Sequence, residues 1–357
     1  MDEAGGPVKA FAYAERWGHE EVVLLRDARS GLRAIIAMHD TTLGPAIGGT
    51  RMRAYASEDD ALLDALRLAK AMTYKSAMAG MRYGGGKAVI IGDPARDKTD
   101  ALLTAYARAV ERLGGRFHTG TDMGLDERDI KVMSRVTRHA THTAPGARID
   151  SADLAALGVF ASIEKAAQGL GRPLRGLHVA VQGLGEVGGR LGRQLADAGA
   201  RLTVADIAPG RVGHAVSVWG ARAVAPEAIY DVEADVFSPN AAGGVLDETT
   251  IARLRCRAVV GAANEQFADD GAGEALHARG ILYGPDYVVN AGGLLSVLFE
   301  TGELDERGIT ARVRGIADTL ADVWTRARQE GAPPHRIADR MVEERLAAAR
   351  AARLEAR

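Results

Sequence analysis

The sequence has almost no cysteine, no long apolar run and almost no net charge, and each absence removes a class of protein. Its 357 residues include one cysteine, Cys256, which can form neither an internal disulfide nor a zinc cluster. No run of about 18 apolar residues is present, so no membrane partner is expected. The formal net charge is −2, which argues against nucleic-acid binding.

Two further absences concern location and metals. Residues 1–6 read MDEAGG, without the basic start and apolar stretch of a secretory signal. With the single cysteine, this predicts a cytoplasmic protein. The nine histidines contain no HExxH motif, so no metal is expected.

Glycine, in contrast, is abundant, with 43 residues or about 12%, where about 7% is typical. At roughly 100–200 residues per domain, the length predicts two domains. The polar segment 142–153 is the expected boundary, which gives domains over 1–148 and 149–330. The arginine-rich residues 331–357 are expected to form a helix that packs back on the first domain.

Residues 1–148 mix strands and helices around glycine-rich loops. The expected elements are strands at 8–14, 20–27 and 32–40, a helix from the Ser57–Asp60 capping box to about residue 71, a glycine loop at 84–86 that leads into a strand, and a helix at 99–113.

From residue 177 onward, strands and helices alternate regularly. This spacing predicts a parallel sheet with helices on both faces, so the fold class is α/β with a doubly wound second domain. The expected strands are 177–182, 201–206, 234–239, 258–264 and 281–284, and the expected helices are 153–169, 186–198, 210–219, 247–254, 271–279, 308–330 and 335–357.

A dinucleotide fingerprint lies at the first of these strands. The strand runs into Gly183-x-Gly185-x-x-Gly188, a helix follows, and the next strand ends at Asp206. The glycines allow a tight turn, the approach of a pyrophosphate and close helix packing, and the acid can bind ribose hydroxyls. Asp206 favours NAD over NADP, although Arg211 lies nearby in the sequence.

Two lysines occupy unusual positions. Lys75 follows a predicted helix, and Lys87 follows three glycines. A shielded lysine can lose its proton near neutral pH and act as a base, a second can hold a carboxylate, and Asp122 can complete an acid–base set. Most lysines are solvated surface charges, so these residues alone leave the function open.

The order of motifs resembles the leucine/valine/phenylalanine dehydrogenases, within the glutamate dehydrogenase superfamily. The resemblance covers about residues 10–350. It is carried by TTLGPAIGGTRM (41–52), MTYKSAMAGMRYGGGKAVIIGDP (72–94), GRFHTGTDMG (115–124), VAVQGLGEVG (179–188), ADVFSPNAAGGVL (234–246), VVGAANEQ (259–266) and ILYGPDYVVNAGGLL (281–295).

This resemblance implies reversible, NAD-dependent oxidative deamination of an L-amino acid to a 2-oxo acid and ammonia. It implies an N-terminal α/β substrate and oligomerisation domain, a Rossmann-type NAD-binding domain, a cleft between them, and a homo-oligomer. Lys87 then corresponds to the base that activates water, Asp122 to the proton-shuttling acid, and Lys75 to the lysine that binds the substrate carboxylate.

The resemblance also implies the residues that line substrate and cofactor. The expected substrate wall is Ile47, Gly48, Gly49, Gly120, Leu294 and Val297. The expected cofactor residues are Gly183, Gly185, Glu186, Val187, Gly188, Asp206, Ile207, Asn240, Ala263 and Asn264.

Two positions bear on the substrate's side chain. Leucine-type relatives tend to have alanine at Gly120 and valine at Leu294, whereas phenylalanine-type relatives match this chain at both. The expected substrate is therefore aromatic, with phenylalanine first, and a branched-chain amino acid is the nearest alternative. A glutamate-type pocket would need an extra cation, which Ile47 and Gly120 do not supply.

Three positions depart from the family pattern. Ala155, Asn240 and Glu265 stand where threonine, cysteine and asparagine are usual, all near the expected nicotinamide site. They support one alternative of another class, a catalytically impaired homologue that binds NAD or an amino acid and acts as a regulator. The presence of Lys75, Lys87 and Asp122 argues against it.

Overall fold

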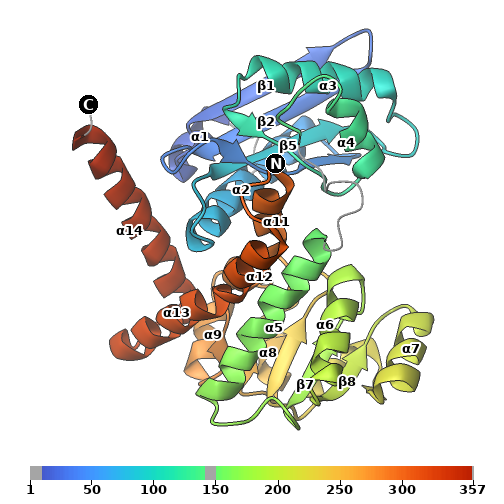
Figure 1. Ribbon diagram of the computed structural model, residues 1–357, viewed down its shortest axis with the longest axis vertical. Coiled ribbons are helices and arrows are strands. Elements are labelled where there is room, and N and C mark those ends of the chain that lie inside the picture. Colours follow the sequence, from blue (N-terminus) through green and yellow to red (C-terminus); the bar gives the residue numbers. More distant parts are fainter. Residues whose placement is uncertain (1–9, 141–149, 356–357) are drawn as a thin grey trace. The chain divides into compact units, whose positions relative to one another are not determined.

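The computed structural model describes residues 10–140 and 150–355 and separates into two compact units. Unit 1 comprises Met1–Ala147 and Val342–Arg357, and unit 2 comprises Arg148–Met341 (Figure 1). Among the described residues, no helix is both long enough and apolar enough to cross a membrane.

Unit 1 contains a mixed sheet in the order β1-β2-β5-β3-β6, with β4 also paired to β5. The pairs β1–β2 and β2–β5 are antiparallel, while β3 and β4 run parallel to β5. The strands are β1 (Glu21–Asp27), β2 (Leu32–Asp40), β3 (Ala46–Ile47), β4 (Thr50–Arg53), β5 (Gly84–Ile91) and β6 (Phe117–His118).

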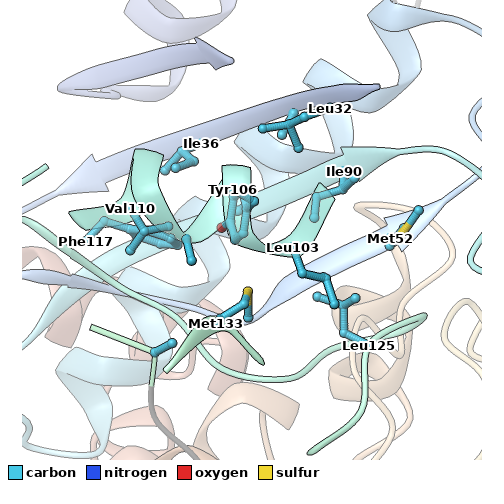
Figure 2. Close-up of a cluster of buried hydrophobic side chains, with 14 of the residues drawn as sticks. Leu32, Ile36, Met52, Ile90, Leu103, Tyr106, Val110, Phe117, Leu125 and Met133 are labelled. Carbon is cyan, nitrogen blue, oxygen red and sulfur yellow. The ribbon is translucent and has the colours of Figure 1, made fainter. Parts of the chain in front are cut away.

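Both faces of this sheet are buried under helices. Its helices are α1 (Ala10–Trp17), α2 (Glu58–Met78), α3 (Asp100–Arg112) and α4 (Glu127–Met133). Strand residues of one parity pack with α1 and α2, as Ile35 and Val89 do. Residues of the other parity pack with α3 and α4, in a cluster that includes Leu32, Ile36, Met52, Ile90, Leu103, Tyr106, Val110, Phe117, Leu125 and Met133 (Figure 2). A side chain's position along a strand therefore decides which helix it meets.

The prediction of a strand at 8–14 is wrong for residues 10–14, the part that the structure describes, because residues 10–17 form helix α1. The apparent alternation came from Phe11 and Tyr13, but Phe11 is exposed and Tyr13 is buried. Tyr13 instead contacts Trp17, with ring centroids 5.2 Å apart. Residues four apart lie on one helix face, so helical spacing decides this segment.

The glycine run 84–86 is not a loop, as predicted, but the first part of β5. A Cβ on Gly85 would lie 2.0 Å from the backbone nitrogen of Thr73 on α2, and one on Gly86 would lie 2.9 Å from the Phe117 ring. The glycines are needed because neighbouring elements approach this strand on both faces. Helix α2 also continues past the predicted end at 71, so Lys75 lies in its last turn.

Unit 2 contains a six-stranded sheet in the order β12-β11-β10-β7-β8-β9, with every pair parallel. Numbered within the unit, this is the 3-2-1-4-5-6 order of a Rossmann fold. The structure thus confirms the predicted α/β class and doubly wound sheet. The strands are β7 (His178–Gln182), β8 (Arg201–Ala205), β9 (Arg222–Ala223), β10 (Val236–Pro239), β11 (Ala258–Val259) and β12 (Leu282–Tyr283).

Unit 2 contains the helices expected at 153–169, 186–198, 210–219, 247–254 and 271–279, and also helical segments at 226–231, 286–289 and 292–300 that the sequence did not predict. The helix expected at 308–330 is divided into two at Gly315. The helices are α5 (Ser151–Gly169), α6 (Glu186–Asp197), α7 (Pro209–Trp219), the 3₁₀ helix η1 (Pro226–Asp231), α8 (Glu248–Arg253), α9 (Ala272–Ala278), α10 (Asp286–Val289), α11 (Gly292–Glu300), α12 (Glu306–Arg314) and α13 (Ile316–Glu330).

The last helix, α14 (Pro334–Glu355), begins in unit 2, and its residues from Val342 onward belong to unit 1. There Arg345 donates to the Ala77 carbonyl over 2.9 Å, and Arg350 pairs with the buried Asp40. These contacts hold the end of α14 against α2 and β2. The predicted domain boundary at 142–153 falls largely outside the described residues.

We expect Gly85→Ala to lower the free energy of unfolding by about 1–3 kcal/mol, the usual cost of forcing an extra carbon into a packed site. Urea unfolding measures this loss. Gly210→Ala on α7 is the matched control, because a Cβ there meets no atom within 4 Å. Unchanged stability of Gly85→Ala would contradict the close packing of α2 on β5.

Candidate active site

Lys87 lies in the middle of β5 and faces helix α2. Side chains on this strand alternate between faces, and Val89 packs in the cluster with α2, so Lys87 shares that face. Its side chain is only 6% exposed. A buried lysine is rare without a partner of opposite charge.

That partner is Asp122, in the segment that follows β6. The Lys87 ammonium donates to Asp122 Oδ2. Asp122 Oδ1 accepts from Arg51 Nε at 3.1 Å and from the Met123 backbone at 2.5 Å. The carboxylate is therefore fixed through both of its oxygens.

Burial and charge act in opposite directions on this pair. Burial lowers the pKa of the Lys87 ammonium, and the charge of Asp122 opposes this change without reversing it. Burial acts to raise the pKa of the Asp122 carboxyl, but the charges of Lys87 and Arg51 outweigh it, and the pKa lies below its usual value. The site thus holds an ionised carboxylate beside a lysine that releases its proton more readily than usual.

Arg51 continues the network away from Lys87. It lies on β4, in register with Val89 of β5, and so shares the α2 face. Its Nη1 donates to Asp64 Oδ2 on α2 over 2.9 Å, and Tyr55 donates to the same oxygen over 2.7 Å. Sequence reasoning missed these three residues. The available signal was an arginine directly after the GGT of a glycine loop.

The other expected substrate residues of unit 1 lie near this network. Ile47 is buried on β3, and Gly120 accepts from the Thr50 backbone over 3.0 Å. A Cβ on Gly48 would lie 1.7 Å from the Gly86 carbonyl, and one on Gly49 would lie 2.4 Å from the Thr121 carbonyl. Close chain packing alone thus requires Gly48 and Gly49.

Two expected substrate residues, Leu294 and Val297, belong to unit 2. They lie three positions apart on α11, both half-buried, so they share one face of that helix. Lys75 is half-buried in the last turn of α2.

The fingerprint glycines of unit 2 each have a separate physical reason. Gly183 has φ +88° and ends β7 in a turn, and a Cβ on Gly188 would lie 2.1 Å from the Gly183 carbonyl. Gly185 has no atom within 4 Å of its Cβ position, although it caps α6. No neighbouring atom of the protein therefore requires glycine at position 185. Its missing side chain leaves open space at a helix N-terminus, where a pyrophosphate fits. Glu186 and Val187 begin α6.

Asp206 follows β8 and supports the same loop. Its carboxylate accepts from the Leu184 backbone over 2.6 Å and from the Ala208 backbone over 2.7 Å. Arg211 Nη1 stands 3.8 Å from it, and the next residue, Ile207, is 90% exposed. The acid at the end of the second strand fits a ribose and disfavours a 2′-phosphate, so the residues present fit NAD.

Asparagine side chains link the ends of the neighbouring strands. Asn240, after β10, donates to the Ser238 carbonyl over 2.8 Å and accepts from the Ala262 backbone over 2.9 Å. Asn290 donates to the Asn264 side chain over 2.9 Å. Sequence reasoning missed Asn290, which contacts the candidate cofactor residue Asn264, although it lies in the quoted VVNAGG motif. Ala263 is buried beside Asn264.

The three departures from the family pattern occupy well-defined positions. Ala155 is buried in α5. Glu265 has a φ of +51°. Among the described residues, it is the single residue other than glycine whose φ is positive. Its backbone nitrogen donates to Asp286 Oδ2 over 2.5 Å. Asn240 uses its side-chain amide to bind the backbone of two segments, contacts that the cysteine expected from the family pattern could not make in the same way.

A Rossmann sheet with a complete fingerprint, together with a buried lysine–aspartate pair, defines a nicotinamide-dependent dehydrogenase. Residues 19–139 match the Glu/Leu/Phe/Val dehydrogenase dimerisation domain, and residues 211–353 match the Glutamate/Leucine/Phenylalanine/Valine dehydrogenase domain. The chain belongs to the Glu/Leu/Phe/Val dehydrogenase family, as the sequence motifs predicted.

Relatives cover nearly the whole chain. Leucine dehydrogenase of Thermoactinomyces intermedius is 43% identical over 343 residues, covering 95% of this chain and 94% of that protein. Valine dehydrogenase of Streptomyces coelicolor is 45% identical over 345 residues, covering 95% of each. The solved L-tryptophan dehydrogenase of Nostoc punctiforme is 39% identical with a TM-score of 0.85, covering 96% of this chain and 100% of that one. The protein is an NAD-dependent amino-acid dehydrogenase.

We expect Gly185→Ala to weaken NADH binding roughly tenfold or more, equivalent to about 1.4 kcal/mol, because its methyl group would enter the space for the pyrophosphate. The thermal midpoint should stay unchanged, since no atom lies within 4 Å. Fluorescence titration with NADH measures the dissociation constant, with Gly169→Ala at the end of α5 as the control, because a Cβ there also meets no atom within 4 Å. Equal NADH affinities in both variants would place the pyrophosphate elsewhere.

Proposed function

We propose that this protein catalyses the reversible oxidative deamination of a branched-chain L-amino acid, leucine or valine, to its 2-oxo acid and ammonia. The observation that carries the proposal is the 40–45% identity to leucine and valine dehydrogenases over almost the whole chain. The aromatic substrate expected from Gly120 and Leu294 receives no support from those relatives.

The reaction needs three functions around the substrate, and each has a candidate residue. Lys75 binds the α-carboxylate. When bound, NAD would supply the acceptor for the hydride from Cα. The ionised Asp122 takes a proton from the substrate's ammonium group as the imine forms. Lys87, as the neutral amine, takes a proton from the water that attacks the imino carbon, and Asp122 returns its proton to the departing nitrogen. The products are the 2-oxo acid and ammonia.

Unit 2 supplies the cofactor-binding residues. Gly183, Gly185 and Gly188, with the start of α6 at Glu186 and Val187, would hold the pyrophosphate through backbone N–H groups. Asp206 and Ile207 would contact the adenosine end, and Asn240, Ala263 and Asn264 the nicotinamide end. For the substrate side chain, the proposed contacts are Ile47, Gly48, Gly49 and Gly120 in unit 1, and Leu294 and Val297 in unit 2.

An aromatic substrate remains the second candidate, because one specific observation favours it. A relative of solved structure that covers nearly all of this chain is an L-tryptophan dehydrogenase. Differences in side-chain volume within an apolar pocket change specificity by only about 1–3 kcal/mol. A few pocket residues can therefore reverse the order of substrates within the family.

We expect NADH formation to be faster with leucine and valine than with phenylalanine, tryptophan and glutamate, as measured by kcat/KM across the panel. Lys87→Ala should lower kcat roughly 10²–10⁴-fold, the usual contribution of a general base. Lys131→Ala is the control, because that lysine is exposed on α4 of the same unit.

Each other outcome has a defined meaning. A higher kcat/KM with phenylalanine or tryptophan would replace the branched-chain proposal by the aromatic one. Activity retained by Lys87→Ala would overturn the assignment of the base. No turnover with any amino acid, in either direction, would favour the regulatory homologue and direct attention to Ala155, Asn240 and Glu265.

The family domain matched by residues 19–139 is a dimerisation domain, and we propose that this chain forms a homo-oligomer through unit 1. Strand β1 lies at one edge of the sheet and exposes Leu24 to 74%. An exposed apolar edge strand readily pairs with another chain.

We expect Leu24→Lys to reduce the molecular mass measured by light scattering, because a charge on the edge strand disfavours contact between copies. Val218→Lys is the control, since Val218 is 62% exposed on α7 of unit 2. An unchanged mass for Leu24→Lys would exclude β1 as the contact.

A further inference from the structure

Lys87 is the first member of a row of ion-paired side chains in which positive and negative charges alternate. Lys87 binds Asp122, Asp122 binds Arg51, and Arg51 binds Asp64. Tyr55 ends the row with its hydroxyl on Asp64. Four separate segments of unit 1 supply these residues: β5, the segment after β6, β4 with the turn beyond it, and α2.

Arg51 holds two carboxylates at once with different nitrogen atoms. Its Nε donates to Asp122 over 3.1 Å, and its Nη1 donates to Asp64 over 2.9 and 3.2 Å. The planar guanidinium fixes the angle between these bonds, which a lysine cannot do. The side chains of Arg51 and Asp64 are 17% and 10% exposed, so water screens these contacts poorly.

The charge balance makes Arg51 important for a base at Lys87. With Arg51 present, Asp122 faces two cations, Lys87 and Arg51, while Asp64 faces Arg51 and the more exposed Arg67. Without Arg51, Lys87 would be the cation left beside Asp122 among the described ion pairs, and Asp64 would keep only its contact with Arg67. The proton of Lys87 would be held more tightly, and Asp122 would lose one of the two cations that keep it ionised.

We propose that Arg51 is a positioning residue of the reaction, which orients Asp122 against Lys87 and is itself held by Asp64 and Tyr55. This inference rests on the proposed roles of Lys87 and Asp122. It adds a function for Arg51, which touches neither substrate nor cofactor in the proposed mechanism.

The same face carries other charged or titratable groups, and none replaces Arg51. His39 on β2 uses both ring nitrogens, on Thr73 Oγ1 and the Trp17 carbonyl, and burial lowers its pKa. The charged or titratable groups around this network and His39 include Lys87 from β5, Arg51 and Tyr55 from β4 and the turn beyond it, Asp64, Arg67, Lys70 and Lys75 from α2, His39 from β2, Glu343 from α14, and Asp122.

The test is the pH profile of kcat/KM for oxidative deamination, measured with the full-length protein and its best amino acid. The acidic limb of this profile is the range in which activity falls as Lys87 becomes protonated. In Arg51→Met this limb should move to higher pH by about one unit, because losing a nearby positive charge raises the pKa of the Lys87 ammonium. The substrate's own ionisation is common to all variants and cancels in the comparison. Arg33→Met is the control, because it removes a half-exposed partner of Glu58 in the same unit.

Two further variants separate charge from geometry. Arg51→Lys keeps the charge, so its acidic limb should stay close to that of the parent, while kcat falls roughly tenfold because Asp122 is no longer oriented. Asp64→Asn removes a negative charge that favours protonated Lys87, so its acidic limb should move to lower pH. A merely structural role would lower activity without shifts of opposite sign.

The inference fails if the limb of Arg51→Met coincides with that of Arg33→Met, or if Arg51→Lys shifts it as far as Arg51→Met does. If Arg51→Met does not fold, as judged by its thermal midpoint, the profiles of Arg51→Lys and Asp64→Asn decide in the same way. Lys87→Ala and Asp122→Asn, assayed alongside, separate the two hypotheses. Full activity in both would overturn the proposed mechanism, whereas inactivity in both with unshifted Arg51 variants would overturn this inference alone.

Discussion

The structure of unit 1 depends on one constraint, which is that the charge of Lys87 must be kept inside a sheet covered on both faces. Removing an ammonium from water costs several kcal/mol unless an opposite charge accompanies it. Asp122 meets this need, and the segment after β6 must pass close to β5 to bring it there. Gly48 and Gly49 allow that approach, because any side chain would collide with the Gly86 or Thr121 carbonyl.

The same constraint explains the strand register. Arg51 pairs with Val89 across β4 and β5, so Arg51 and Lys87 project to the α2 face while Met52 and Ile90 project into the opposite core. A shift of one residue would bury the arginine among apolar side chains and expose the methionine. The register that builds the apolar core is thus also the register that assembles the charged network, and stability and chemistry favour the same pairing.

Local patterns predicted the features that are local in the chain, and the pairing of Lys87 with the distant Asp122 was expected only with the help of the family resemblance. The fingerprint was readable because a strand, a turn and a helix start follow one another from His178 to Asp206. The contact of Arg51 with Asp64 depends on β4 pairing beside β5 and α2 crossing that face, which no short pattern records. The error at residues 10–17 has the same origin, since Tyr13 is buried only because α1 packs on α2 and β2. The glycines at 84–86 looked like a loop because their neighbours come from elsewhere in the chain.

The departures at Asn240 and Glu265 lie where a Rossmann sheet reverses its strand order, at the carboxyl ends of β7 and β10 and the adjacent turn. Asn240 binds the Ser238 carbonyl and the Ala262 backbone through its side-chain amide, and so ties the end of β10 to the segment after β11. Glu265 accepts a left-handed backbone that most residues avoid, held by Asp286. Both residues fix the backbone at the crevice through contacts within unit 2, whereas Lys87 and Asp122 are fixed by contacts within unit 1. Each unit therefore builds its part of the candidate site on its own core.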